Sequence, residues 1–124
     1  MTVPANLRYT AHDEWIAVDG DVVTLGITDF AQDQLGELVH IELPAIGSTY
    51  AAGAAVCEVE SVKAVAEVYT PVGGEIIEVN ADLDGDEGQI NADAYGAWLV
   101  RIKVSDASGL DGLMDAAAYS AKIG

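Results

Sequence analysis

One lysine occupies a position at which its amine can be modified and presented to other proteins. Lys63 lies near the break between two predicted strands, residues 57–61 and 65–69, and has acidic neighbours. The other two lysines, Lys103 and Lys122, lie in a predicted strand and near the chain end. An amine at an exposed tip can be acylated, which removes its charge and extends the attached group on a long flexible stem. A modifying enzyme and several client active sites can then reach that group.

The turn that would present Lys63 is atypical for a hairpin. Val62 is β-branched and disfavours positive φ, so a mirror-image turn centred on Val62 and Lys63 is costly. We therefore expect a type I turn or a slightly wider loop. The alternative to a modified residue is an ordinary solubilising lysine beside Glu60 and Glu67. A lone lysine does not decide between the two.

The other chemically versatile side chains indicate structural roles. The single cysteine, Cys57, lies in an apolar stretch and is expected to be a small buried hydrophobic residue. His40 alternates within a predicted strand, and His12 has no metal-binding partner at a suitable spacing. The acidic segment 82–88 lacks the spacing of an EF-hand loop, so we expect a solvated loop and no metal site.

Most of the chain around these residues is predicted to be β-strand. Segments with alternating polarity or clustered β-branched residues are bounded by Gly, Pro and Asp. Asp19-Gly20-Asp21, between two such segments, is a strong hairpin signal. Many short strands with Gly and Pro turns indicate a small sandwich or barrel, in which Trp15 and Trp98 would be core anchors. The predicted strands are residues 15–18, 22–25, 38–43, 57–61, 65–69, 76–79 and 98–104.

Two helices are expected beside the strands. Asp29 can cap a short helix with Gln32 as its reciprocal partner, and Gly36 can end it. From Ser108 onward the apolar period becomes helical, and Ser108 with Asp111 resembles a capping box. The apolar face of this second helix would comprise Leu110, Leu113, Met114, Ala117 and Ala121.

The charge balance excludes some classes of partner. The formal net charge is −16, with only five Lys and Arg in total. Nucleic-acid binding and anionic membrane binding both require clustered cations, so neither is expected. The charge favours a soluble monomer and can also steer the chain toward partners with basic docking surfaces.

Location and domain number follow from length and segment patterns. The first residues show no signal-peptide pattern, and no apolar stretch is long enough to cross a bilayer. A single cysteine excludes an intrachain disulfide and fits a reducing compartment. We expect a cytoplasmic protein with one domain, residues 1–124.

The residues around Lys63 resemble a known family. Glu60-Ser61-Val62-Lys63-Ala64, followed by Tyr69–Asn80, is similar to the lipoyl-lysine region of glycine cleavage system H proteins. The similarity continues in the same order over nearly the whole chain. Further similar segments are Tyr9-Thr10, Glu14-Trp15, Gly26–Gln32, Leu35-Gly36, Val39–Pro44, Ile90–Gly96 and Trp98-Leu99.

The resemblance implies a fold and a function. The fold would be mainly β, a lipoyl/biotinyl-type barrel-sandwich hybrid with a short internal helix and a C-terminal helix. The chain would be a non-catalytic carrier with lipoic acid attached to Lys63 by a lipoate ligase or lipoyl transferase. It would take the aminomethyl group of glycine from a pyridoxal-phosphate glycine decarboxylase to a tetrahydrofolate-dependent aminomethyltransferase. Dihydrolipoamide dehydrogenase would then reoxidise the arm.

Glu14 and Glu67 are candidates for docking the loaded arm, by their charge and family position. A loaded aminomethyl group is labile in water, so a polar cleft that holds it should protect it. Both residues can instead be solvated surface carboxylates. The chain departs from the family nearby, with Asp13 and Gln34 where histidine is usual and Ala94 where proline is usual.

Other carriers fit the lysine region less well. Lipoyl domains of 2-oxoacid dehydrogenases usually have Asp before the lysine and Ala-Pro-rich linkers, and biotin carriers usually have Met-Lys-Met. Val62-Lys63-Ala64 matches neither pattern. An H-like protein that relays lipoate to other complexes remains an alternative, as does an unmodified β-sandwich interaction module.

Overall fold

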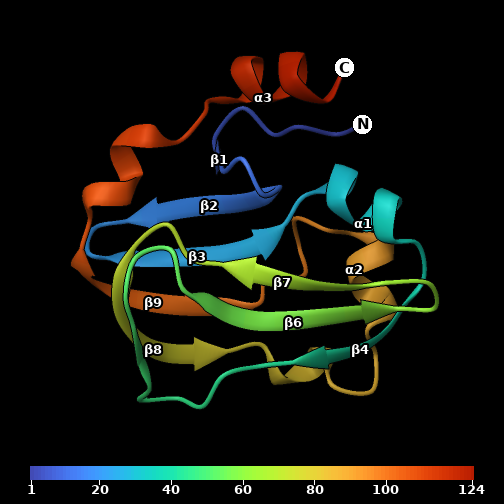
Figure 1. Cartoon of the computed structure of the whole chain (residues 1–124), viewed down its shortest axis with the longest axis horizontal. Coiled ribbons are helices and arrows are strands. Elements are labelled where there is room, and N and C mark those ends of the chain that lie inside the picture. The colour runs from blue at the N-terminus through green and yellow to red at the C-terminus, as the bar shows by residue number, and fades with distance from the viewer.

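Two antiparallel sheets form the framework that positions the hairpin of Lys63 (Figure 1). The structure is a computed structural model and describes all 124 residues. The larger sheet has the strand order β1-β2-β3-β9-β8-β5, and the smaller sheet has the order β4-β6-β7. The strands are β1 Arg8–Tyr9, β2 Glu14–Asp19, β3 Val22–Ile27, β4 Leu38–Glu42, β5 Thr49–Tyr50, β6 Ala55–Ser61, β7 Val65–Tyr69, β8 Gly73–Val79 and β9 Val100–Asp106.

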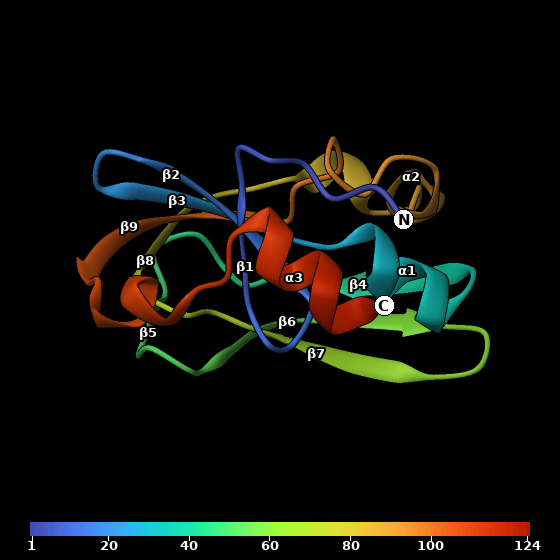
Figure 2. The same ribbon diagram turned by 90° about the horizontal axis from the view of Figure 1, so that it is seen from above.

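The main core lies between the two sheets, because alternate residues of their strands point inward. Ile16 and Leu25 of the larger sheet and Ile41, Val59 and Val68 of the smaller sheet belong to one cluster of buried residues. Figure 2 shows β6 and β7 as a layer separate from β2, β3 and β9. The predicted fold class is confirmed as a mainly β barrel-sandwich arrangement, whose two sheets do not close into a barrel.

All seven predicted strands exist, and the predicted bounds of β7 are those observed. The two strands that were not predicted, β1 and β5, have two residues each, too few to show a period. In β6 the register shifts between Ala55 and Cys57. Such an irregularity interrupts the alternation of faces, which explains why Val56 and Cys57 are both buried.

The internal helix is confirmed as α1, Asp29–Leu35, with a different cap from the one predicted. Thr28 is the N-cap, and its side chain accepts a hydrogen bond from the Ala31 N–H. Asp29 is already inside the first turn, where its carboxylate accepts a hydrogen bond from the Gln32 side chain. Gly36 ends the helix at a φ of 82°, a value that glycine adopts without strain.

The prediction of one continuous helix from Ser108 was wrong. A 3₁₀ helix, η2 Ser108–Gly112, comes first, and α3, Ala116–Ile123, begins after an extended break. Asp115, and not Ser108, caps α3 by accepting the Ala118 N–H. The break resets the helical phase, so Tyr119 is the buried residue of α3, and Ala117 and Ala121 are exposed.

The acidic segment 82–88 is only partly a loop. It begins within a 3₁₀ helix, η1 Ala81–Leu83, and ends at the start of α2, Gly88–Ala92. Leu83 and Ile90 are fully buried and hold these short helices against the main core. Neither these helices nor any other helix of the chain has the length and apolar character needed to cross a membrane.

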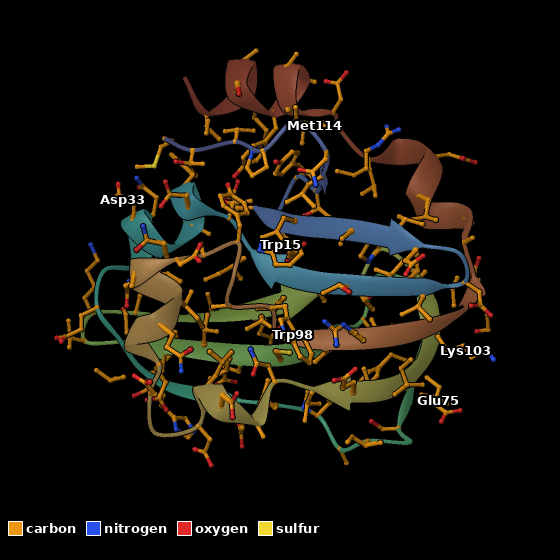
Figure 3. The ribbon with its side chains drawn as sticks, turned by 180° about the vertical axis from the view of Figure 1, so that it is seen from behind. Trp15, Asp33, Glu75, Trp98, Lys103 and Met114 are labelled. Atoms are coloured by element: carbon orange, nitrogen blue, oxygen red, sulfur yellow. The ribbon has the colours of Figure 1, made fainter.

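A second apolar cluster covers the outer face of the larger sheet beneath α3. It consists of Tyr9, Trp15 and Tyr119, with Trp98 packed against it as a half-buried side chain. Figure 3 shows Trp15 and Trp98 on this face. Trp15 is confirmed as a buried anchor, and its indole N–H donates to the Ala94 carbonyl at 3.1 Å. The indole lies over Gly26, where an added Cβ would be 2.4 Å from the ring. Glycine at position 26 therefore allows β2 to bury its tryptophan.

Candidate functional site

Lys63 lies at the tip of the β6–β7 hairpin, as predicted. Its side chain is exposed, and the hairpin tip lies at the same end of the molecule as α1 and α2 (Figures 1 and 2). Asp13 is the only non-glycine residue with positive φ. The predicted absence of a mirror-image turn at Val62 and Lys63 is therefore confirmed.

Ser61 organises the tip from inside the hairpin. Its N–H donates to the Ala64 carbonyl at 2.8 Å, which closes the turn. Its buried hydroxyl accepts the N–H groups of Lys63 and Ala64 at 3.3 and 3.0 Å. The Ser61 side chain thus binds two backbone N–H groups of a turn that has no residue at positive φ and therefore needs no glycine.

The tip is also attached to the body of the protein. The Val62 N–H donates to the Glu37 carbonyl at 3.1 Å, which joins the tip to the loop between α1 and β4. The Lys63 side chain leans over this loop, since a Cβ added to Gly36 would lie 3.7 Å from Lys63 Cε. Val62 and Val65 are 68% and 58% exposed, so apolar side chains flank the amine at the surface.

Glu14 is buried, which excludes the alternative that it is a solvated surface carboxylate. It is 1% exposed. One carboxylate oxygen accepts the Thr10 hydroxyl at 2.5 Å and the other accepts the Tyr69 N–H at 3.0 Å. Burial raises the pKa of the Glu14 carboxyl, although these two hydrogen bonds and nearby His12 favour its charged form.

Tyr69 connects the two candidate carboxylates. Its N–H binds Glu14, and its phenol donates to the exposed Glu67 carboxylate at 3.1 Å. The bond to Glu67 raises the pKa of the Tyr69 phenol. The His12 ring lies against the Tyr69 ring with centroids 4.8 Å apart. Sequence reasoning missed Thr10, His12 and Tyr69 as a group, because the β1–β2 turn and the end of β7 meet only in the fold.

Three carboxylates lie next to one another on the outer face of the smaller sheet, one from each strand. Glu58 of β6 pairs with Glu42 of β4 on one side and with Glu67 of β7 on the other. All three line a hollow of 280 Å³. Side chains directly opposite each other in adjacent strands lie close together, so these three carboxylates repel one another and attract cations. Lys63 lies farther along the same hairpin, toward its tip.

Among the other reactive side chains, Cys57 is buried as predicted, whereas His40 has no structural role of the kind that was expected. Cys57 is free and buried, and burial raises the pKa of its thiol to about 12, which suppresses the thiolate. His40 projects from β4 to solvent. No three side chains of the His, Cys, Asp and Glu types converge as a metal-binding group anywhere in the chain.

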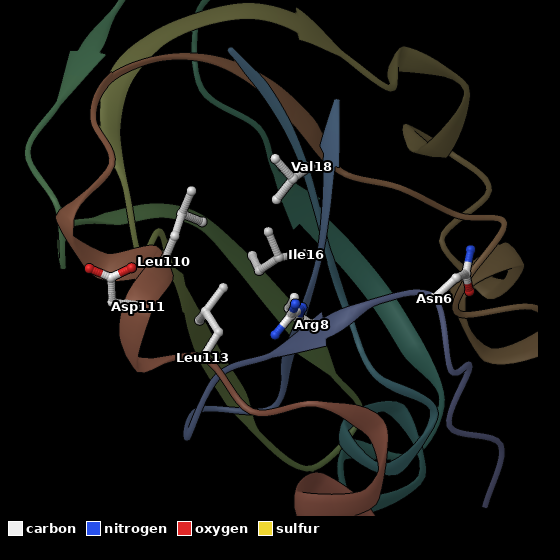
Figure 4. Close-up of a pocket in the computed structure, with 7 residues that line it drawn as sticks. All are labelled: Asn6, Arg8, Ile16, Val18, Leu110, Asp111 and Leu113. Carbon is white, nitrogen blue, oxygen red and sulfur yellow. The ribbon is translucent and has the colours of Figure 1, made fainter. Parts of the chain in front are cut away.

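The largest hollow lies away from the lysine. It has a volume of 540 Å³ and is bounded by the β1–β2 region and by η2 (Figure 4). Arg8 and Asp111 both line it, with apolar side chains between them. In Figures 1 and 2, η2 lies at the end of the molecule opposite the tip of the β6–β7 hairpin. This hollow is therefore not part of the Lys63 site.

Comparisons with known proteins agree on one family. A family model described as glycine cleavage H-protein matches residues 7–124. A glycine cleavage system H protein of Parvibaculum lavamentivorans is 50% identical over 117 residues, with 94% of each chain covered. One of Bradyrhizobium diazoefficiens is 52% identical over 114 residues, covering 91% of this chain and 93% of its own. The crystal structure of a glycine cleavage system H protein from Mycobacterium marinum superposes with a TM-score of 0.88 at 36% identity, covering 96% of this chain and 97% of that one.

Proposed function

Because the chain belongs to the glycine cleavage H-protein family, we propose that Lys63 is the residue that carries its lipoyl group. Members of this family are non-catalytic carriers with covalently attached lipoate. The chain is thus a lipoyl carrier that works with the other components of the glycine cleavage system. Bound lipoate supplies a dithiolane that accepts the aminomethyl group of glycine, and the protein presents and shelters it.

The position of Lys63 carries the assignment. It is the one lysine at a hairpin tip, and it forms no ion pair. The other two lysines are each near a carboxylate, Lys103 at 3.8 Å from Asp21 and Lys122 at 3.7 Å from Asp13. An acylating enzyme can approach Lys63 without disturbing a strand or a helix.

The acidic row Glu42–Glu58–Glu67 is proposed as the surface on which the partners dock. The partners would be a lipoate ligase or lipoyl transferase, the pyridoxal-phosphate glycine decarboxylase, the aminomethyltransferase and dihydrolipoamide dehydrogenase. A net charge of −16 accelerates encounter with the basic surfaces of partners. The acidic row, which includes two residues of the hairpin that carries the arm, would then orient each partner. Once the body is docked, the tethered arm has a high effective concentration at the partner's active site.

We propose that Glu67 holds the amine of the loaded arm and that Glu14 assists indirectly. Glu67 is exposed on β7, four residues beyond Lys63, and can contact an ammonium group directly. Glu14 has both oxygens engaged and lies behind Tyr69. It would act by orienting Tyr69 and by adding negative charge beneath it, without touching the amine.

The proposal includes a monomer in the cytoplasm. The edge strands of the larger sheet, β1 and β5, are two residues long and offer little backbone for pairing with a second copy. The edge strands of the smaller sheet, β4 and β7, are five residues long, but they carry the carboxylates Glu42 and Glu67, which disfavour pairing with a second copy. The free, buried Cys57 shows that the fold uses no disulfide, which suits a reducing compartment.

The test is loading by a lipoate ligase. The purified chain would be incubated with ligase, ATP and lipoate, and its intact mass and peptide map would be measured. We expect one lipoyl adduct, on Lys63, and no adduct on Lys63→Arg. Lys103→Arg and Lys122→Arg are matched controls that should load like the wild type. An unmodified wild-type chain, beside a lipoyl domain that loads in the same tube, would refute the assignment.

A further inference from the structure

Asn91, which lies in α2 far from Lys63 in sequence, contacts the loop that supports the lysine hairpin. Its side-chain N–H groups donate to the Gly36 carbonyl at 2.8 Å and to Gln32 Oε1 at 2.9 Å. Its Oδ1 accepts the Leu38 N–H at 3.0 Å. One amide thus joins the end of α1, the turn after it and the start of β4.

This loop holds the hairpin tip from outside. Glu37, between the two loop residues that Asn91 binds, accepts the Val62 N–H at 3.1 Å. Leu38 is paired with Ser61 at the last position of the β4–β6 ladder. Ser61 and Val62 are therefore attached to residues 37 and 38. Asn91 binds this loop at Gly36 on one side of Glu37 and at Leu38 on the other.

The loop has features that such support would offset. Gly36 has a φ of 82°, and glycine loses more conformational freedom on ordering than any other residue. The ladder between β4 and β6 is irregular between Leu38 and His40. A polar hollow of 480 Å³, lined by Asp33, Glu37 and Asn91 among others, also leaves the loop accessible to water on one side.

We infer that Asn91 is a positioning residue for the modified lysine: its amide holds residues 36–38 so that the tip presents Lys63 in one orientation to the enzyme that loads it. This inference rests on the proposed function in taking Lys63 as the loaded residue. Asn91 does not contact the amine, so its effect is on productive docking of the tip. Losing it should raise the KM of the apo chain as a ligase substrate and leave kcat almost unchanged.

The experiment combines ligase kinetics with amide hydrogen exchange on the apo chain. Asn91→Ala removes all three hydrogen bonds, and Asn91→Asp keeps only the acceptor for Leu38 and sets a carboxylate against two oxygen acceptors. For both variants we expect exchange at the Val62 N–H to accelerate about tenfold and KM to rise by a similar factor, since at least two hydrogen bonds through which Asn91 supports residues 36–38 are lost. The matched control is Asn80→Ala, which removes a partly buried asparagine that donates to the Trp98 carbonyl at 2.9 Å, away from the tip.

The two readouts separate this inference from the assignment of Lys63. If wild-type chain is not loaded, the lysine assignment fails, while Val62 exchange still tests the role of Asn91. If Asn91→Ala matches Asn80→Ala in both Val62 exchange and KM, Asn91 does not position the tip. Equal acceleration of exchange across all strands would also overturn the inference, because it would mean global destabilisation.

Discussion

The phenol of Tyr119, near the end of the chain, donates a hydrogen bond of 3.0 Å to the carboxylate of Asp13, near its beginning. Asp13 has a φ of 66°, a conformation that aspartate tolerates better than most residues. The same phenol lies 2.7 Å from the buried Thr28 hydroxyl, which caps α1. Through Tyr119, helix α3 thereby joins two segments: the turn before Glu14 and the start of α1.

Removing the Tyr119 hydroxyl should destabilise the fold. Tyr119→Phe keeps the ring that stacks on Tyr9 at 4.7 Å and deletes both hydrogen bonds. We expect a loss of about 1–3 kcal/mol in the free energy of unfolding, measured with urea, because the buried Thr28 and the half-buried Asp13 each lose a hydrogen bond. Tyr69→Phe is the control, since its hydroxyl bond to Glu67 is exposed. Equal stability of these two variants would contradict the role assigned to Tyr119.

The buried Glu14 carboxyl should make stability depend on pH. Burial raises its pKa above the ordinary 4.5, so the folded state holds this proton more tightly than the unfolded state. The resulting stabilisation is complete below pH 4.5 and is lost as pH rises through the folded-state pKa.

Glu14→Gln should remove this dependence. We expect the free energy of unfolding of the wild type, minus that of Glu14→Gln, to fall as pH rises from about 4 to 7. Urea unfolding at several pH values measures it. Glu75→Gln, which removes an exposed carboxylate on β8, controls for the change in net charge. A difference that stays constant or rises with pH would show that the hydrogen bonds to Glu14 outweigh its burial.

The sequence predicts the elements that have a period and misses those that depend on distant contacts. Strand β7 has its predicted bounds because its residues include the β-branched Val65 and Val68 and the aromatic Tyr69, and Pro71 follows soon after its end. The position of Lys63 at a hairpin tip was predictable because the β-strand pattern is interrupted between β6 and β7. The C-terminal prediction failed because Leu110 and Leu113 continue a helical period across a break that only the pairing of Met114 with Tyr9 reveals.

The exposed position of Lys63 was predictable, and the surroundings of the site were not. Exposure of Lys63 follows from its place between two strands. Burial of Glu14 depends on Thr10 and on Tyr69, which is 55 residues away in sequence. No local pattern marks a carboxylate that meets its partners only after two sheets pack together.

Gly26 should be intolerant of even one added methyl group. An added Cβ would lie 2.4 Å from the Trp15 indole, whose N–H binds Ala94. We expect Gly26→Ala to lower the free energy of unfolding by about 1–3 kcal/mol through overpacking. Gly88→Ala, where nothing lies within 4 Å of the added Cβ, should change it by less than about 0.5 kcal/mol. Tryptophan fluorescence during urea unfolding reports both, and equal midpoints would show that the indole moves aside freely.

Glu67 should protect the loaded arm more than Glu14 does, because only Glu67 offers an exposed carboxylate to an amine. Chain lipoylated and loaded with the aminomethyl group would be isolated, and its release of ammonia followed over time. We expect Glu67→Gln to release ammonia about threefold to tenfold faster than wild type, the effect of losing one charge-assisted contact.

Glu75→Gln, an equivalent charge change on the other sheet, is the control and should release ammonia at the wild-type rate. If Glu14→Gln releases ammonia faster than Glu67→Gln, the amine reaches past Tyr69 and binds the buried carboxylate directly. If neither variant differs from Glu75→Gln, the arm is sheltered elsewhere.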